Sequence, residues 1–266
     1  MRYIKTLLSA SIVSISMGMS FNANAVPVDI AFVVDQSASM GSEFGWIPNV
    51  ISSIDTALQG EAVVTSTRYG IAGYMEGVGN EVAGASTGFT DEYHDLAYVD
   101  LTPNVATVSG AATLAGSDLR AFTERGYHAA DWSRSGFSWA ADAVKVMILI
   151  TDEAADQGST IADVGMGSDE ANLGKLLSDD NILLNVITNR SLFSQWDQAV
   201  FDQSGTYKGL FDLGFLRSNP ADFTTQFVAA KVGEITGTVT TVPNPPTLLL
   251  VIAGLLGMRR FQKAQT

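Results

Sequence analysis

The sequence predicts a doubly wound α/β domain, in which helices flank a mostly parallel central sheet. Two apolar runs, 30–34 and 146–150, show no alternation of apolar and polar residues, which is typical of strands buried on both faces. Amphipathic stretches with helical spacing separate the expected strands. Strands that alternate with helices along a chain favour a parallel sheet covered on both sides.

Each further element is expected from its own local pattern. The stretch 42–58 is predicted to be an amphipathic helix, because its apolar residues recur at steps of three and four, and Gly60 is expected to end it. Asn219 and Pro220 suit the start of a helix, as the cap and the first helical residue. The full expected order is strand 28–34, helix 42–58, strand 69–75, a surface excursion over 76–95, edge strand 96–101, helix 104–114, a helix near Tyr127, strand 144–150, helix 169–177, strands 181–188 and 209–213, and a last helix from Pro220.

Charge and cysteine content exclude several classes of function. The chain has 266 residues and a net charge of −13. It contains no cysteine, so a disulfide framework, a cysteine-based zinc site and a cysteine nucleophile are excluded. The two ends hold five of the 15 basic residues and none of the 28 acidic ones, so the part between them is still more acidic. Such a surface repels nucleic acid and attracts cations, and nucleic-acid binding is not expected.

The N-terminal stretch 1–25 has the layout of an export signal. Arg2 and Lys5 give a positive start, an apolar stretch follows, and the small residues Ala23 and Ala25 frame an expected cleavage site. We therefore expect a mature chain that begins at Val26, with one domain over 26–242.

The C-terminal stretch 243–266 combines a Pro-rich spacer, a short apolar run and a basic end. The apolar run over 247–258 is shorter than the roughly 20 residues of a stable transmembrane helix. The layout resembles the PEP-CTERM sorting signal of Gram-negative bacteria, with Asn244 in place of the family's glutamate. The resemblance implies recognition and cleavage by an exosortase-type membrane enzyme. A weak C-terminal membrane anchor is the alternative.

Polar side chains follow the first expected strand directly. Asp35 ends the strand, and Ser37 and Ser39 come at alternate positions after it. In an open α/β sheet, ligands bind beyond the carboxyl ends of the strands. One carboxylate and two hydroxyls are hard oxygen donors of the kind that magnesium, manganese or calcium prefers. The same residues suit a simple turn and helix cap, so both interpretations stay open from the residues alone.

The Asp-x-Ser-x-Ser motif of Asp35, Ser37 and Ser39 resembles the start of the metal-ion-dependent adhesion site (MIDAS) of von Willebrand factor type A (vWA) domains. The resemblance covers about residues 28–235. It implies a Rossmann-like, doubly wound vWA fold.

The resemblance also implies a threonine from a second loop and an aspartate from a third loop at the same site. Thr123 precedes an expected helix, where its simpler role is a helix N-cap, and Thr90 is the alternative threonine. Asp152 follows the strand 144–150, which corresponds to the central strand of the family. In the family the hydroxyls bind the cation directly, while the aspartates often act through water.

The function implied is that of an exported binding protein and not of an enzyme. A divalent cation, most often Mg²⁺ with Mn²⁺ or Ca²⁺ as alternatives, would bind an acidic group of a protein or polysaccharide partner at the cell surface or in the extracellular matrix. A structural matrix or biofilm protein without metal is an alternative, and a metal-dependent hydrolase is another. Against the hydrolase, Ser37 stands where phosphatase chemistry needs a second aspartate, and neither His94 nor His128 lies in a recognisable triad setting.

Overall fold

A single mixed sheet forms the centre of the domain. The computed structural model describes residues 25–74, 98–117, 119, 125–155, 161–200 and 209–241. Within these ranges six strands pair in the order β3-β2-β1-β4-β5-β6, with β3 antiparallel to β2 and all other pairs parallel. The strands are β1 (Val26–Asp35), β2 (Val64–Tyr74), β3 (Val99–Thr102), β4 (Val144–Ile150), β5 (Ile182–Thr188) and β6 (Leu210–Asp212).

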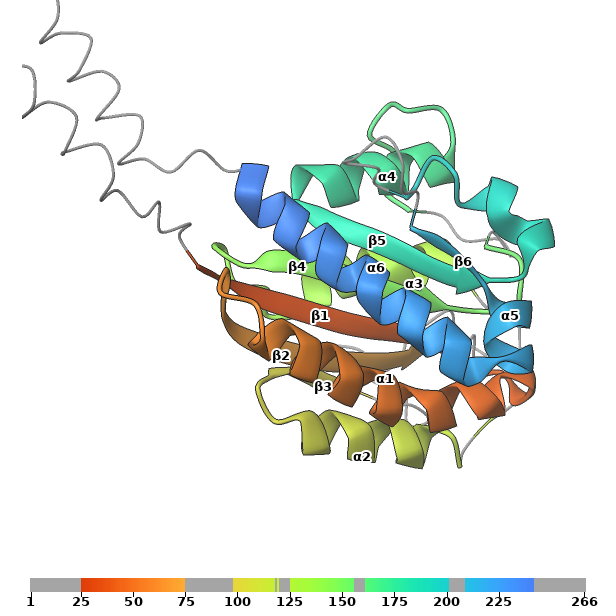
Figure 1. The fold of residues 1–266 in the computed structure, drawn as a ribbon. Coiled ribbons are helices and arrows are strands. Elements are labelled where there is room, and N and C mark those ends of the chain that lie inside the picture. The colour runs from red at the N-terminus through yellow and green to blue at the C-terminus, as the bar shows by residue number, and fades with distance from the viewer. Residues whose placement is uncertain are drawn as a thin grey trace, which may run out of the picture. The chain divides into compact units, whose positions relative to one another are not determined.

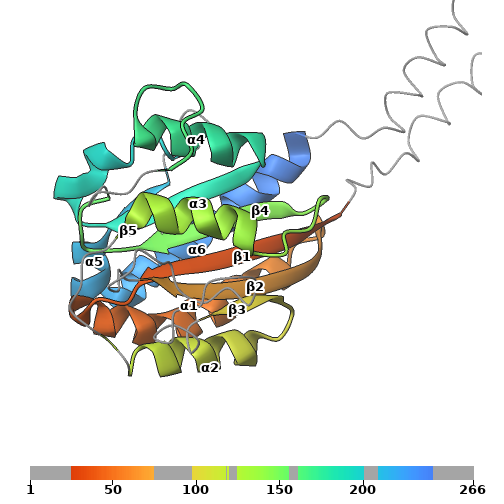
Figure 2. The same ribbon diagram turned by 180° about the vertical axis from the view of Figure 1, so that it is seen from behind.

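Helices cover both faces of the sheet. Figure 1 shows α1, α2 and α6 on one face, and the opposite view in Figure 2 shows α3 and α4 on the other. The helices are α1 (Gly41–Gln59), α2 (Val105–Ala115), α3 (Gly126–Gly136), α4 (Asp169–Asp179), α5 (Leu213–Ser218) and α6 (Pro220–Thr241), with 3₁₀ turns η1 (Ala38–Met40) and η2 (Arg190–Gln195). The doubly wound α/β fold predicted from the sequence is therefore confirmed. None of the helices in the described ranges is long and apolar enough to cross a membrane.

Strand β1 lies in the middle of the sheet and is buried on both sides. Ile30, Phe32 and Val34 join the core under α1, α2 and α6, while Ala31 and Val33 join the core under α3 and α4. Because both faces pack against helices, the positions from Ile30 to Val34 are all apolar, and this run shows no alternation of apolar and polar residues.

Two details near the helix ends differ from expectation. The N-cap position of α3 is Arg125, two residues after the expected cap Thr123. Helix α5 was not predicted, since six residues are too few to show a helical period. Asn219 ends α5 and directly precedes Pro220, the first residue of α6. Thr123 itself and the excursion over 76–95 lie outside the described residues.

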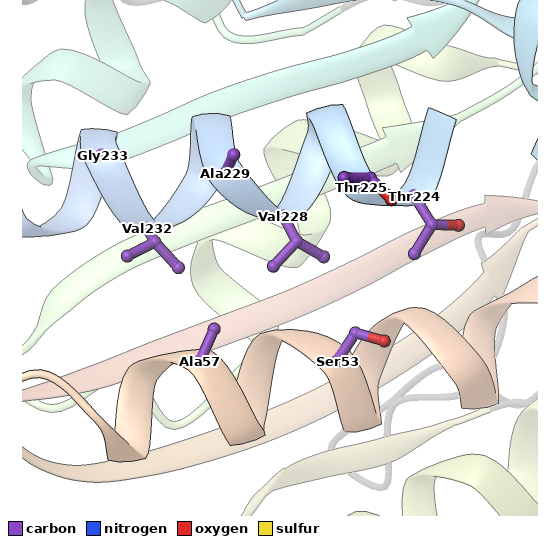
Figure 3. Close-up of a pocket in the computed structure, with 8 residues that line it drawn as sticks. All are labelled: Ser53, Ala57, Thr224, Thr225, Val228, Ala229, Val232 and Gly233. Atoms are coloured by element: carbon purple, nitrogen blue, oxygen red, sulfur yellow. The ribbon is translucent and has the colours of Figure 1, made fainter. Parts of the chain in front are cut away.

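A shallow groove runs between α1 and α6 on the helix-covered surface (Figure 3). Val228 and Val232 of α6 and Ala57 of α1 point toward each other across it, and Ser53 and Thr224 lie at one end. The side chains that line this groove include no acid, base or imidazole, so the groove offers no catalytic or metal-binding chemistry.

Close packing of α4 against the segment after η2 gives a test of the fold. A Cβ atom added at Gly174 would lie 2.3 Å from the carbonyl oxygen of Gln198, a backbone atom that cannot move away cheaply. We expect Gly174→Ala to lower the free energy of unfolding by about 2–3 kcal/mol, measured by urea denaturation. Gly233→Ala on α6 is the matched control: nothing lies within 4 Å of its Cβ position. It should gain about 0.5–1 kcal/mol. Equal effects at both positions would contradict this packing.

Candidate metal site at the strand ends

The candidate site lies at the carboxyl edge of the sheet, at the point where the connections from β1 lead to opposite sides of the sheet. From β1 the chain continues to β2 on one side, and later places β4 on the other side of β1. Ligands bind at such a switch point in open α/β folds. Val34 of β1 pairs with Ile150 of β4, so the next residues of the two strands, Asp35 and Thr151, are neighbours.

Asp35 is buried and held in one orientation by two donors. The backbone N–H of Ser37 donates to one carboxylate oxygen at 2.7 Å, and the hydroxyl of Thr151 donates to the other at 2.9 Å. The first bond closes a tight turn directly after β1, and the second joins the ends of β1 and β4. Both bonds fix the carboxylate before any ligand arrives.

A chain of hydrogen bonds continues from this turn to the third predicted loop. The Oγ atoms of Ser37 and Ser39 are 3.0 Å apart, and the Ser39 hydroxyl donates to Oδ1 of Asp152 at 2.9 Å. Ser37 is buried, whereas Ser39 is exposed. The oxygen atoms therefore run from the interior to the surface, which gives solvent access to one end of the site.

The charge of Asp35 is not balanced within the described part of the chain. Its partners there are an amide and a hydroxyl, and no basic side chain within those ranges forms an ion pair with it. Burial raises the pKa of this carboxyl group to about 6, although the hydrogen bonds from Ser37 and Thr151 act in the opposite direction. A bound cation would offset the cost of burying this charge.

The donor set fits a hard divalent cation. It consists of two carboxylates and two hydroxyls drawn from the ends of neighbouring strands, and oxygen ligands of this kind suit magnesium, manganese and calcium. No cluster of three or more acidic or imidazole side chains occurs in the described ranges. A metal site in which hydroxyl groups supply part of the ligands does not need such a cluster.

The structure brings together four of the five predicted ligands. Hydrogen bonds between side chains connect Ser37, Ser39 and Asp152. Asp35 joins this group through the backbone N–H of Ser37, which donates to its carboxylate. Thr123 lies outside the described residues, as does its alternative Thr90, so the second-loop ligand stays a prediction.

Two residues at the site were not foreseen. Thr151 could have been found, because it directly precedes Asp152 at the end of a buried strand. Arg217 of α5 has no comparable signal in the sequence. Its guanidinium donates to Oδ2 of Asp152 at 3.0 Å and to the carbonyl of Ser39 at 3.0 Å. It also forms an ion pair with the buried Glu43 at 2.7 Å.

Arg217 thus links α5 to both parts of the candidate site. The carboxylate of Asp152 accepts from Ser39 at one oxygen and from Arg217 at the other. Asp152 is therefore held in place, and its negative charge is partly neutralised. These two effects act on cation binding in opposite directions.

Comparison with known proteins gives matches by structure only. No protein-family model matches the chain, and no curated protein matches its sequence. The vWF domain of the type V pili tip protein Mfa5 from Porphyromonas gingivalis has a TM-score of 0.50 and 12% identity, over 79% of this chain and 97% of that one. The pilus adhesin SpaC from Lactobacillus rhamnosus GG has a TM-score of 0.48 and 15% identity, over 80% and 30%. Proximal thread matrix protein 1 from the mussel byssus, with a zinc-occupied MIDAS motif, has a TM-score of 0.48 and 14% identity, over 78% and 47%.

The match to the Mfa5 domain shows the fold. The described strands and helices form a vWA-type α/β domain, as the sequence resemblance implied. The chain spans less than half the length of the mussel byssus structures.

Proposed function

We propose that this chain is an exported, metal-dependent binding protein that holds an acidic group of a partner through a divalent cation at the carboxyl edge of its sheet. The observation that carries the proposal is the hydrogen-bonded group of Ser37, Ser39 and Asp152 beside the buried Asp35. These side chains come from loops more than 100 residues apart in sequence, and the sheet brings their oxygen atoms together.

The residues divide the work of holding the cation. Asp35 supplies a fixed negative charge, Ser37 and Ser39 supply neutral oxygens, and Asp152 supplies the second charge from the β4 loop. Thr123 is proposed as a further hydroxyl ligand. A divalent cation held by two charges at most would remain electrophilic and accept a carboxylate from the partner.

The termini belong to the same proposal. We propose that 1–25 is a signal peptide removed on export and that 243–266 is a PEP-CTERM-type sorting signal processed by an exosortase-type enzyme. The mature domain over 26–242 would then act at the surface of a Gram-negative cell or in its matrix. The Mfa5 domain with this fold belongs to a pilus tip protein, and a surface role for the present chain is part of the proposal.

Two alternatives make different predictions. A metal-free matrix protein would keep partner binding in EDTA. A hydrolase would turn over a generic phosphate ester, but Ser37 takes the place of the second acid that this chemistry requires. The uncompensated burial of Asp35 favours the metal-binding function over the metal-free one.

Binding to carboxylate surfaces tests the function. The full chain should bind surfaces coated with poly-L-glutamate or a uronic-acid polysaccharide in millimolar Mg²⁺, and EDTA should reduce binding at least tenfold, because the cation forms the bridge. Surface plasmon resonance measures this, with neutral dextran as the control surface. Binding that survives EDTA would favour the metal-free alternative, and turnover of p-nitrophenyl phosphate would favour the hydrolase.

A further inference from the structure

A second polar cluster lies inside the domain, away from the strand-end site. Lys231 of α6 is fully buried, and its ammonium group contacts the side-chain carbonyl oxygen of Asn185, in the middle of β5. Glu234, one turn further along α6, is 2.5 Å from the same Nζ atom. Figure 1 shows α6 crossing the face of the sheet that includes β5.

Both residues occupy positions where the pattern calls for apolar side chains. On β5, Leu183 and Ile187 share the face of Asn185 and belong to the core beneath α1 and α6. On α6, Lys231 lies at four-residue spacing between Phe227 and Ile235, which are buried in that core. Two polar side chains thus meet across an otherwise apolar helix–sheet interface.

The surroundings exclude water from the contact. Asn185 and Lys231 have no solvent exposure. The Nζ atom lies 5.1 Å from the ring centre of Phe211 and 5.5 Å from that of Phe227. Glu234 also reaches the amide, since its Oε2 atom is 3.4 Å from Nδ2 of Asn185. One carboxylate oxygen is therefore close to both the amine and the amide nitrogen.

We propose that Lys231 and Asn185 form an intramolecular isopeptide bond, with Glu234 transferring the protons. Glu234 first takes a proton from the Lys231 ammonium, which leaves a neutral amine. The amine nitrogen attacks Cγ of Asn185 and forms the new C–N bond. Glu234 gives its proton to Nδ2 and takes one from Nζ, so that the Cγ–Nδ2 bond breaks and ammonia leaves. No oxidant, cofactor or other reactant is needed.

The electrostatics of the cluster support this step. Burial lowers the pKa of Lys231 to about 8, even though Glu234 acts to raise it. The amine is therefore easier to deprotonate than an exposed lysine, and desolvated lysines are effective nucleophiles. Enclosure also places the amine beside its electrophile in the folded state only.

The bond would tie the last helix to the sheet. Helix α6 packs most closely against α1, α5 and β4, and the chain continues beyond it at residue 242. A covalent link at Lys231 would hold the helix on β5 when the following segment is pulled. The chain has no cysteine, so a disulfide cannot serve this purpose.

Mass spectrometry of the purified full chain tests the proposal. The wild-type protein should be lighter than its sequence by one ammonia molecule. Trypsin should release a branched peptide that joins 176–190 to 218–259, because an acylated Lys231 is not cleaved. The branched peptide is decisive, since an asparagine that cyclises on its own backbone also loses ammonia.

Two variants complete the experiment. Glu234→Gln keeps the size of the side chain but cannot shuttle protons, so it should retain the ammonia and yield a linear peptide that ends at Lys231. Asp222→Asn, in the exposed first turn of α6, should behave as the wild type. A wild-type chain with its full sequence mass and a linear peptide ending at Lys231 would overturn the proposal, whatever the fate of the variants. The cluster would then be a buried ion pair only.

Discussion

Replacement of Asp35 by alanine is expected to abolish the rise in unfolding temperature that a divalent cation produces in the wild-type chain. A ligand that binds only the folded state stabilises it by about 2.7 kcal/mol at 100 times Kd. For a domain of this size, that corresponds to roughly 5–10 °C. Asp35 carries one of two charges at the site and is fully buried, so the remaining donors should hold the cation too weakly to shift the transition. Differential scanning calorimetry of the full chain in Mg²⁺, Mn²⁺, Ca²⁺ or EDTA measures the effect.

Matched substitutions separate charge from packing at this position. Asp35→Asn keeps the size of the side chain and an acceptor for the Ser37 amide, but it removes the charge, so it should lose the metal effect as well. Asp222→Ala removes an exposed carboxylate on α6 and should keep the effect. If both Asp35 variants still respond to metal, the cation binds elsewhere on this acidic chain. If the wild type shows no response at millimolar concentration, the metal bridge must be abandoned.

The sequence predicts strands well where the fold buries both faces. Strand β4 was expected from the apolar run that starts at Val144, because its positions from Val146 to Ile150 are buried. Strand β2 begins at Val64, five residues before the expected start. Its first residues include Thr65, Ser66 and Arg68, which are polar because this end is exposed or half-buried. The apolar run shows only the buried part of a strand.

Some residues of the candidate site could likewise be predicted from the sequence, and others could not. Asp35 could be predicted because ligands bind beyond the carboxyl ends of the strands in an open α/β sheet. Asp152 was implied by the resemblance to vWA domains. Arg217 could not be predicted, because its place at the site depends on how α5 packs against the loop after β1. Lys231 could not be recognised as buried either, since a single lysine within an apolar stripe usually extends to solvent.

Substitution of Arg217 by methionine is expected to destabilise the fold more than any change at the metal ligands. Its guanidinium is the ion-pair partner of Glu43, whose side chain is only 1% exposed. Loss of one partner leaves a buried charge without compensation, which costs about 3–5 kcal/mol at fully buried pairs. The arginine is 34% exposed, so water can replace part of the interaction. We therefore expect a loss of about 2–3 kcal/mol in urea denaturation.

The double variant Glu43→Gln/Arg217→Met isolates the effect of the guanidinium on the metal site. Removing both charges should restore most of the stability, because a neutral pair leaves no buried ion. The same variant lacks the guanidinium group that lies 3.0 Å from the carboxylate of Asp152. Two like unit charges about 4 Å apart repel each other by about 1 kcal/mol even in water, and a divalent cation doubles this, whereas a single orienting hydrogen bond contributes about 1 kcal/mol. The double variant should therefore bind Mg²⁺ roughly tenfold more tightly in isothermal titration calorimetry, about 1.4 kcal/mol. Weaker binding, with stability restored, would mean that Arg217 acts mainly by positioning Asp152, and that the orientation of this carboxylate limits cation affinity more than its charge.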